Sequence, residues 1–281
     1  LNITERRLAQ DGRAHIVVGG NGIDLRVATM PTMHGECAVI RLLRKGAGLV
    51  SLDQIGLSAH HEAILRKALL APYGMVIVTG PTGSGKTTTL AASLAVINEP
   101  TRKILTIEDP VEYQIPGITQ TQVHPGIGLT FASALRSFMR LDPDVIMVGE
   151  MRDSETAHIG VHAALTGHLV LTTLHTETAA AAVPRLLDLG VEGYLLRSVL
   201  RGVIAQRLVR QLCERCKTAR PLAAADFTED PRLAALGFKA EEIIQEPCGC
   251  ERCGGTGYRG RLGVFELLEL SNELRELIGE R

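Results

Sequence analysis

Tryptophan is absent from this sequence of 281 residues, and aromatic residues of all kinds make up only 3% of it. Leucine, valine, isoleucine and alanine must therefore fill the interior of a chain whose hydrophobic content, 45%, is that of an ordinary globular protein. An excess of one charge is also lacking, because the formal net charge is −1. This balance argues against a protein whose main task is to bind a nucleic-acid backbone. No apolar run approaches the ~20 residues of a membrane-spanning helix, and no signal peptide is visible.

One glycine-rich stretch carries most of the functional information. The apolar run from Val76 to Thr79 predicts a buried strand, a loop follows, and Lys86-Thr87 opens a predicted helix. This is the phosphate-binding pattern G-x-x-x-x-G-K-[ST] in a strand–loop–helix setting. Glycines let backbone N–H groups converge on phosphate oxygens, and the helix N-terminus favours negative charge. We predict that Lys86 reaches the β- and γ-phosphates of a nucleoside triphosphate and that Thr87 ligates Mg²⁺. The predicted binding residues are Gly80, Pro81, Thr82, Gly83, Ser84, Gly85, Lys86, Thr87 and Thr88.

The sequence before this loop indicates a small β-rich domain. Three runs, at residues 15–18, 23–28 and 38–43, alternate as strands do, and residues 19–22 predict a hairpin turn between the first two. We assign residues 1–46 to the C-terminal part of an N-terminal β-rich domain whose core needs residues upstream of Leu1, so we expect the chain to be a fragment of a longer protein. Glycine-rich residues 45–51 indicate a linker, which we place at residues 47–57.

Residues 58–205 alternate between predicted helices and strands. Ser58 can cap a helix that runs to about Leu70, and a second helix is expected at residues 154–165. Further strands are predicted at residues 103–107, 145–148 and 168–174. Such alternation is typical of a parallel sheet covered on both faces, with its chemistry at the carboxyl ends of the strands.

Carboxylates follow two of these strands. Glu108 and Glu112 come after one, and Glu150 comes after the next. Hydrolysis of a phosphoanhydride needs a carboxylate that orients or deprotonates water and others that hold Mg²⁺ through its waters. Gly149 stands where a Walker B motif usually has aspartate, so we expect Mg²⁺ to be held directly by Thr87 and the phosphates. The alternatives are that Glu150 is a surface acid paired with a nearby arginine, and that Glu108 and Glu112 are solvated.

Two Cys-x-x-Cys pairs lie in residues 206–281, which we assign to a C-terminal subdomain. Such pairs supply four thiolates to a tetrahedral, structural Zn²⁺, and the alternative is redox use of the same pairs. Cys248 could replace one of the four ligands, and Cys37 stands alone and is expected to be buried. The predicted zinc ligands are Cys213, Cys216, Cys250 and Cys253.

Taken together, these segments resemble the secretion ATPases, the motors of type II secretion and type IV pilus assembly. Residues 80–87 match the Walker A motif of that family, residues 104–113 its Asp box, residues 142–153 its atypical Walker B motif and residues 166–176 its His box. The resemblance covers essentially the whole chain. It implies an α/β fold with a RecA-like P-loop NTPase core, an N-terminal β-rich, PAS-like domain fragment and a C-terminal tetracysteine zinc subdomain.

The resemblance also implies roles for particular side chains. Glu150 would activate water, Glu112 would be a second catalytic acid, and His168 and His175 would face the γ-phosphate. An extended strand spans ~23 Å over seven residues, so both histidines cannot contact one phosphate unless the chain turns. His175 is the better contact, and His168 is equally suited to a structural hydrogen bond. Arginines of the N-terminal piece would reach the nucleotide when that domain closes on the core; these are Arg26 and Arg41.

By the same resemblance, the chain would be a cytoplasmic motor that hydrolyses ATP with Mg²⁺ to power type II protein secretion through pseudopilus assembly. Residues 165–168 and 185–191 favour that subgroup, with type IV pilus assembly as the alternative. A homohexamer with residues 258–261 at the subunit contact is implied, bound through inner-membrane secretion platform proteins to the cytoplasmic face of the inner membrane. A nucleic-acid-dependent RecA-like motor and a nucleotide-binding scaffold with little turnover are the rivals. The chain departs from the family's usual Asn-Asp at Glu177-Thr178.

Overall fold

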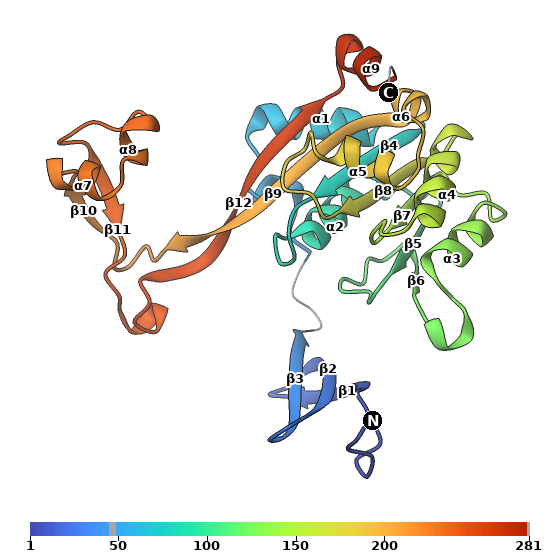
Figure 1. Cartoon of the computed structure of the whole chain (residues 1–281), viewed down its shortest axis with the longest axis horizontal. Coiled ribbons are helices and arrows are strands. Elements are labelled where there is room, and N and C mark those ends of the chain that lie inside the picture. Colours follow the sequence, from blue (N-terminus) through green and yellow to red (C-terminus); the bar gives the residue numbers. More distant parts are fainter. Residues whose placement is uncertain (45–48, 280–281) are drawn as a thin grey trace.

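The computed structural model describes residues 1–44 and 49–279 (Figure 1). Among residues 1–44, three antiparallel strands form a sheet in the order β1 (Gln10–Val18), β2 (Asn21–Thr32) and β3 (Gly35–Arg44). The predicted hairpin turn is confirmed, because Val18 pairs with Asn21 across Gly19 and Gly20, whose φ angles are 56° and 79°. The prediction that Cys37 is buried is wrong: it is exposed, because β3 exposes its side chains from residue 35 to 42.

The predicted linker at 47–57 falls only partly within the described residues. Residues 45–48 lie outside them. Residues 49–57 include a 3₁₀ turn, η1 (Leu52–Gln54), and its Leu52 side chain is buried in the core of the following domain. The described part of the segment therefore packs against the domain that it precedes.

A larger sheet organises residues 58–279 of the described chain. Its seven strands follow the order β12 (Tyr258–Glu269), β9 (Leu200–Leu212), β4 (Gly74–Thr79), β8 (Leu169–Leu174), β7 (Val145–Val148), β5 (Ile104–Glu108) and β6 (Thr119–Gln122). The first pair, β12 and β9, is antiparallel, and the other neighbouring pairs are parallel. The predicted α/β fold is confirmed, and so are the strands predicted within residues 58–205.

Alternate residues of β4 show how the sheet separates two apolar cores. Met75 and Ile77 belong to one core and Val76 and Val78 to the other, as the period of two of a strand requires. Both sets are buried because helices cover both faces (Figure 1). One face carries α1 (Ala59–Leu69) and α2 (Lys86–Ile97). Toward the other lie α3 (Phe131–Phe138), α4 (Ser154–Leu165), α5 (Ala182–Asp188), α6 (Gly193–Val199) and α9 (Asn272–Gly279), with the 3₁₀ turn η2 (Pro125–Ile127) before α3.

Helix boundaries follow their capping residues. The Ser58 side chain accepts a hydrogen bond from the His61 N–H at the start of α1, as predicted. At the start of α4, Asp153 accepts from the Thr156 N–H at 2.8 Å. Asp153 closes the Walker B segment, so this cap fixes where the chain turns back after β7. Among the described residues, no helix is long and apolar enough to cross a lipid bilayer.

Strands β9 and β12 run on beyond the core to a separate C-terminal module (Figure 1). The module contains the strand pair β10 (Thr218–Pro221) and β11 (Ile243–Glu246), the short helices α7 (Ala224–Glu229) and α8 (Arg232–Ala235), and the turn η3 (Glu251–Cys253). The proposed domain boundary between residues 205 and 206 falls inside β9. One strand therefore joins the end of the sheet that carries the glycine-rich loop to the cysteine pairs.

Candidate functional site

The glycine-rich loop lies between β4 and α2, where the sequence places it. Gly80, Gly83 and Gly85 have φ angles of 144°, 78° and 91°, which disfavour any side chain there. The Lys86 ammonium folds over the loop and donates to the carbonyl oxygens of Gly80 at 2.7 Å and Pro81 at 3.0 Å. The Ser84 hydroxyl is buried without a hydrogen-bond partner among the described residues, and Ser84 is not among the residues that line the neighbouring cavity.

A cavity of about 430 Å³ opens beside this loop at the carboxyl ends of the parallel strands. The structure gathers around it most of the residues that the sequence singled out. Among its lining residues are Thr82, Gly83, Gly85, Lys86, Thr87, Thr88, Glu108, Glu112, Glu150 and His175. This arrangement fits a nucleoside triphosphate, because it places phosphate-binding groups opposite carboxylates.

Glu150 is a mostly buried acid with two basic neighbours. Its side chain is 13% exposed, and Oε2 lies 2.6 Å from Arg152 Nε and 3.4 Å from His175 Nε2. The ion pair with Arg152, which the alternative interpretation of Glu150 as a surface acid predicts, is therefore present. It forms at the wall of the cavity, where the two bases hold the carboxylate in one orientation.

Glu108 is buried at the end of β5 and is not the solvated acid of the alternative reading. Its Oε1 accepts from Thr106 Oγ1 at 2.6 Å and from Gln120 Nε2 at 3.0 Å. Burial raises the pKa of Glu108, the two hydrogen bonds oppose that rise, and the Glu112 carboxylate adds to it. Glu112 itself is exposed at the cavity.

Lys86 is the main cation of the loop. Burial lowers the pKa of Lys86, the Glu150 carboxylate raises it, and the Arg207 guanidinium lowers it again. Arg207 comes from β9 and donates to the Glu177 carbonyl at 2.9 Å, so it holds the backbone of the segment that departs from the family pattern. The Arg207 charge therefore lies close enough to Lys86 to affect its pKa, although Arg207 does not itself line the cavity.

The two histidines of the His box lie at opposite ends of β8. His168 precedes the strand, and its Nδ1 lies 2.9 Å from the Ala163 carbonyl oxygen. His175 follows the strand and lines the cavity. The next residue, Thr176, donates from its N–H to Thr79 Oγ1 at 2.8 Å, which fastens this segment to the end of β4. The structure thus brings His175 to the site and leaves His168 in a local hydrogen bond.

Four arginines differ in their position relative to this cavity. Arg26 and Arg41 face each other in register on β2 and β3, and neither is among the residues that line the cavity. Arg152 and Arg261 do line it. The segment 258–261, expected as a turn at a subunit contact, is the start of β12 with an irregular register between residues 258 and 261. The sequence indicated Arg152 only as a surface partner of Glu150 and residues 258–261 only as a subunit contact, so it placed neither Arg152 nor Arg261 at this cavity.

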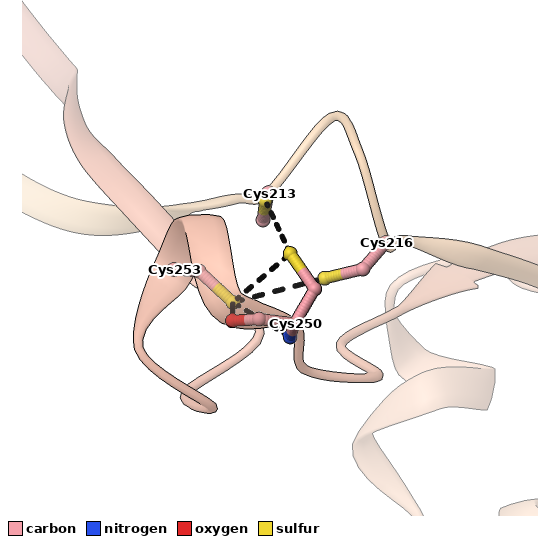
Figure 2. Close-up of side chains that lie close together, drawn as sticks. All are labelled: Cys213, Cys216, Cys250 and Cys253. Atoms are coloured by element: carbon pink, nitrogen blue, oxygen red, sulfur yellow. Dashed lines mark hydrogen bonds between the residues drawn. The ribbon is translucent and has the colours of Figure 1, made fainter.

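Four cysteines meet at the base of the C-terminal module (Figure 2). Their sulfur atoms all lie within 4.8 Å of one another, with Cys213–Cys250 at 3.9 Å and both Cys216–Cys253 and Cys250–Cys253 at 3.8 Å. A Zn–S bond of about 2.3 Å in a tetrahedron gives sulfur–sulfur edges of about 3.8 Å. The donor set therefore fits tetrahedral zinc. Cys248 is exposed and is not part of the cluster.

Backbone N–H groups support this cluster. The Cys253 sulfur accepts from the N–H groups of Cys250 at 3.1 Å and Gly257 at 3.2 Å. Burial opposes ionisation, but these hydrogen bonds outweigh it and lower the pKa of Cys253 to about 6. Burial raises the pKa of Cys216 to about 12. Zinc binds thiolates, so metal binding must displace the proton that burial holds on Cys216.

The chain is similar over its whole length to proteins of bacterial secretion systems. The family described as Type II/IV secretion system protein matches residues 1–281. The chain is 51% identical over 278 residues to the type II secretion system ATPase E of Vibrio cholerae, covering 99% of this chain and 54% of the relative. It is 48% identical over 279 residues to the type II secretion system protein E of Aeromonas hydrophila, covering 99% and 55%. The chain thus spans about half the length of these relatives.

Two further comparisons extend to pilus motors. The type IV pilus assembly ATPase PilB of Thermus thermophilus is 50% identical over 283 residues, which is 99% of this chain and 31% of that protein. The crystal structure of the pilus retraction motor PilT with bound ADP is 31% identical, with a TM-score of 0.67 over 96% of this chain and 66% of the other. These findings confirm the resemblance drawn from the four motifs. The chain belongs to the type II/IV secretion system protein family.

Proposed function

We propose that this chain is the ATP-hydrolysing region of a type II secretion motor. The observation that carries the proposal is that the phosphate loop, Glu150 and His175 line the same cavity. Two relatives that match nearly the whole chain are named for type II secretion. Type IV pilus assembly is the second candidate, supported by the 50% identity to PilB.

Each side chain around the cavity has a chemical task in this proposal. Lys86 exchanges the loop carbonyls for phosphate oxygens, since its ammonium already lies at the loop and is within the field of Glu150. Mg²⁺, when bound, would neutralise charge that develops on the phosphates, and Thr87 at the start of α2 would hold it. Thr87 lines the cavity, so its hydroxyl fits that task.

Glu150 orients and deprotonates the attacking water. Its carboxylate is held by Arg152 and His175, so little reorientation is needed before the proton moves. Glu108 is buried more deeply, and burial raises its pKa. This residue therefore suits a structural role, in which its hydrogen bonds hold neighbouring side chains in place, better than the role of a fully charged catalytic base. Glu112, exposed at the same cavity, would act as the second acid.

We also propose that the four cysteines hold one structural zinc ion, because all four ligand positions are taken and none remains open for a substrate. Redox use of the pairs would involve two sulfurs at a time, whereas all four sulfur atoms lie within 4.8 Å of one another, the arrangement of a tetrahedral metal site. The zinc would secure the module that β9 and β12 carry.

Assembly into a homohexamer belongs to the same proposal. Arg26 and Arg41 are not at the cavity of their own chain, so they would act only when an N-terminal domain closes on a core. A cytoplasmic motor that docks on secretion platform proteins at the inner membrane would convert that closure into work. The near-zero net charge gives no support to a nucleic-acid partner.

Phosphate release from ATP, measured with and without Mg²⁺, tests the proposal. Lys86→Ala removes a charge-assisted contact of about 3 kcal/mol and should lower the rate on the order of 100-fold. Lys67→Ala is the control, because that lysine is exposed on α1, outside the cavity lining, and pairs with Glu269 at 3.6 Å. Tight ATP binding without phosphate release would support the scaffold reading, and release that requires DNA would support the nucleic-acid motor.

A further inference from the structure

A glutamine on β9 contacts the phosphate loop from behind. Gln206 is 3% exposed. Its Nε2 donates to the Ser84 carbonyl oxygen at 2.6 Å, and its Oε1 accepts from Thr89 Oγ1 at 2.7 Å. A carbonyl oxygen can only accept, so the amide orientation follows from the chemistry of its two partners. The Gln206 side chain thus connects the loop to the first turn of α2. It lies 122 residues from Ser84 in the sequence.

The hydrogen bond to Ser84 sets the direction of a neighbouring N–H group. In a trans peptide unit the C=O and N–H bonds point in opposite directions. With the Ser84 carbonyl held against Gln206, the Gly85 N–H of the same unit points away from Gln206. Gly85 lines the cavity, and backbone N–H groups of such loops are what hold phosphate oxygens.

The glycines of the loop leave room for this glutamine. A Cβ at Gly80 would lie 2.4 Å from the backbone carbonyl oxygen of Gln206, and one at Gly85 would lie 2.6 Å from the side-chain Nε2 of the same residue. Both contacts are shorter than atoms tolerate. Gly80 therefore leaves room for the backbone of β9 and Gly85 leaves room for the Gln206 side chain, in addition to adopting φ angles that suit glycine.

We propose that Gln206 is a positioning residue for nucleotide phosphates, which acts by holding the Ser84–Gly85 peptide unit in its binding orientation. Gln206 is not itself among the residues that line the cavity, so its effect passes through the loop. This inference rests on the proposed function, since it requires that the loop binds a nucleotide.

The dissociation constant for ADP, measured by calorimetry on the full chain, tests the proposal. Gln206→Met keeps the length of the side chain and removes both hydrogen bonds, so the constant should rise about 5- to 30-fold, the effect of one to two kcal/mol. Gln211→Met is the matched control, because it makes the same change at an exposed position of the same strand. Its ADP affinity should equal that of the wild type.

A second variant, Gln206→Glu, distinguishes loss of the hydrogen bond to Ser84 from a general destabilisation of the fold. A neutral carboxylic acid can donate to the Ser84 carbonyl, whereas a carboxylate cannot, and burial raises the pKa of such a group. The ratio of the variant's dissociation constant to that of the wild type should therefore fall as the pH is lowered from 8.5 to 6. The pH dependence of Gln206→Glu also tests the proposal if Gln206→Met does not fold.

Two outcomes overturn the inference alone: Gln206→Met that binds ADP within twofold of the wild type, or a ratio for Gln206→Glu that does not change with pH. A wild-type chain that does not bind ADP overturns the proposed function and this inference with it. Weakened binding by Gln206→Met, unchanged binding by Gln211→Met and recovery of Gln206→Glu at low pH together support it.

Discussion

Removing one sulfur from the cysteine cluster should abolish the proposed zinc binding and unfold only the C-terminal module. Cys253 lies 3.8 Å from both Cys216 and Cys250. In Cys253→Ala three ligands remain, so zinc affinity should fall by more than the 10- to 100-fold that loss of an outer-shell partner costs, on the order of 1,000-fold or beyond. The β10–β11 pair has four residues in each strand, and a pair of that size is marginal without further support.

Zinc content after dialysis against a competing chelator, together with limited proteolysis, measures both effects. Wild-type chain should keep about one zinc and Cys253→Ala none, with new cleavage between residues 213 and 257 and an intact core. Cys248→Ala is the matched control, because that thiol is exposed and outside the cluster. One zinc per chain in Cys253→Ala, or loss of zinc in Cys248→Ala, would refute the reasoning.

Three other perturbations follow from single contacts. Thr79→Val keeps a β-branched strand residue but leaves the Thr176 N–H without its acceptor, so calorimetry should show a loss of about 1–3 kcal/mol of stability; an unchanged melting temperature contradicts this. Burial raises the pKa of Glu108 above 4.5, so folding favours its protonated form, and stability falls as the pH rises from 4.5 through that raised pKa. Glu108→Gln should therefore raise the melting temperature at pH 8 and not at pH 4, and an equal shift at both values would argue against it. Arg26→Ala should slow phosphate release with little change in ATP affinity, whereas wild-type turnover would remove that arginine from the mechanism.

Sequence patterns predicted the parts of the site that lie within one strand–loop–helix unit. The phosphate loop, Glu150 and His175 each follow a short apolar strand, and parallel strands bring their carboxyl ends to one edge. The cysteine cluster was predictable for a similar reason, because each Cys-x-x-Cys turn places two sulfurs together. Local spacing contains that information without any knowledge of the fold.

What the sequence could not predict depends on residues distant along the chain. Gln206 reaches the loop only because β9 pairs in parallel with β4, and nothing near residue 206 marks that neighbour. Arg261 reaches the cavity because β12 folds back along β9. Cys37 was expected to be buried from its residue type alone, and the exposure of β3 in this chain decides otherwise.

Glu150→Gln tests the central claim, that this cavity hydrolyses ATP with Glu150 as the group that activates water. The amide keeps the size of the side chain, and it cannot accept a proton from water. ATP affinity should stay within a few-fold of the wild type, while single-turnover phosphate release should fall by about 10²- to 10⁴-fold, the usual contribution of a positioned base. Near-wild-type phosphate release by Glu150→Gln, with normal ATP binding, would contradict the account.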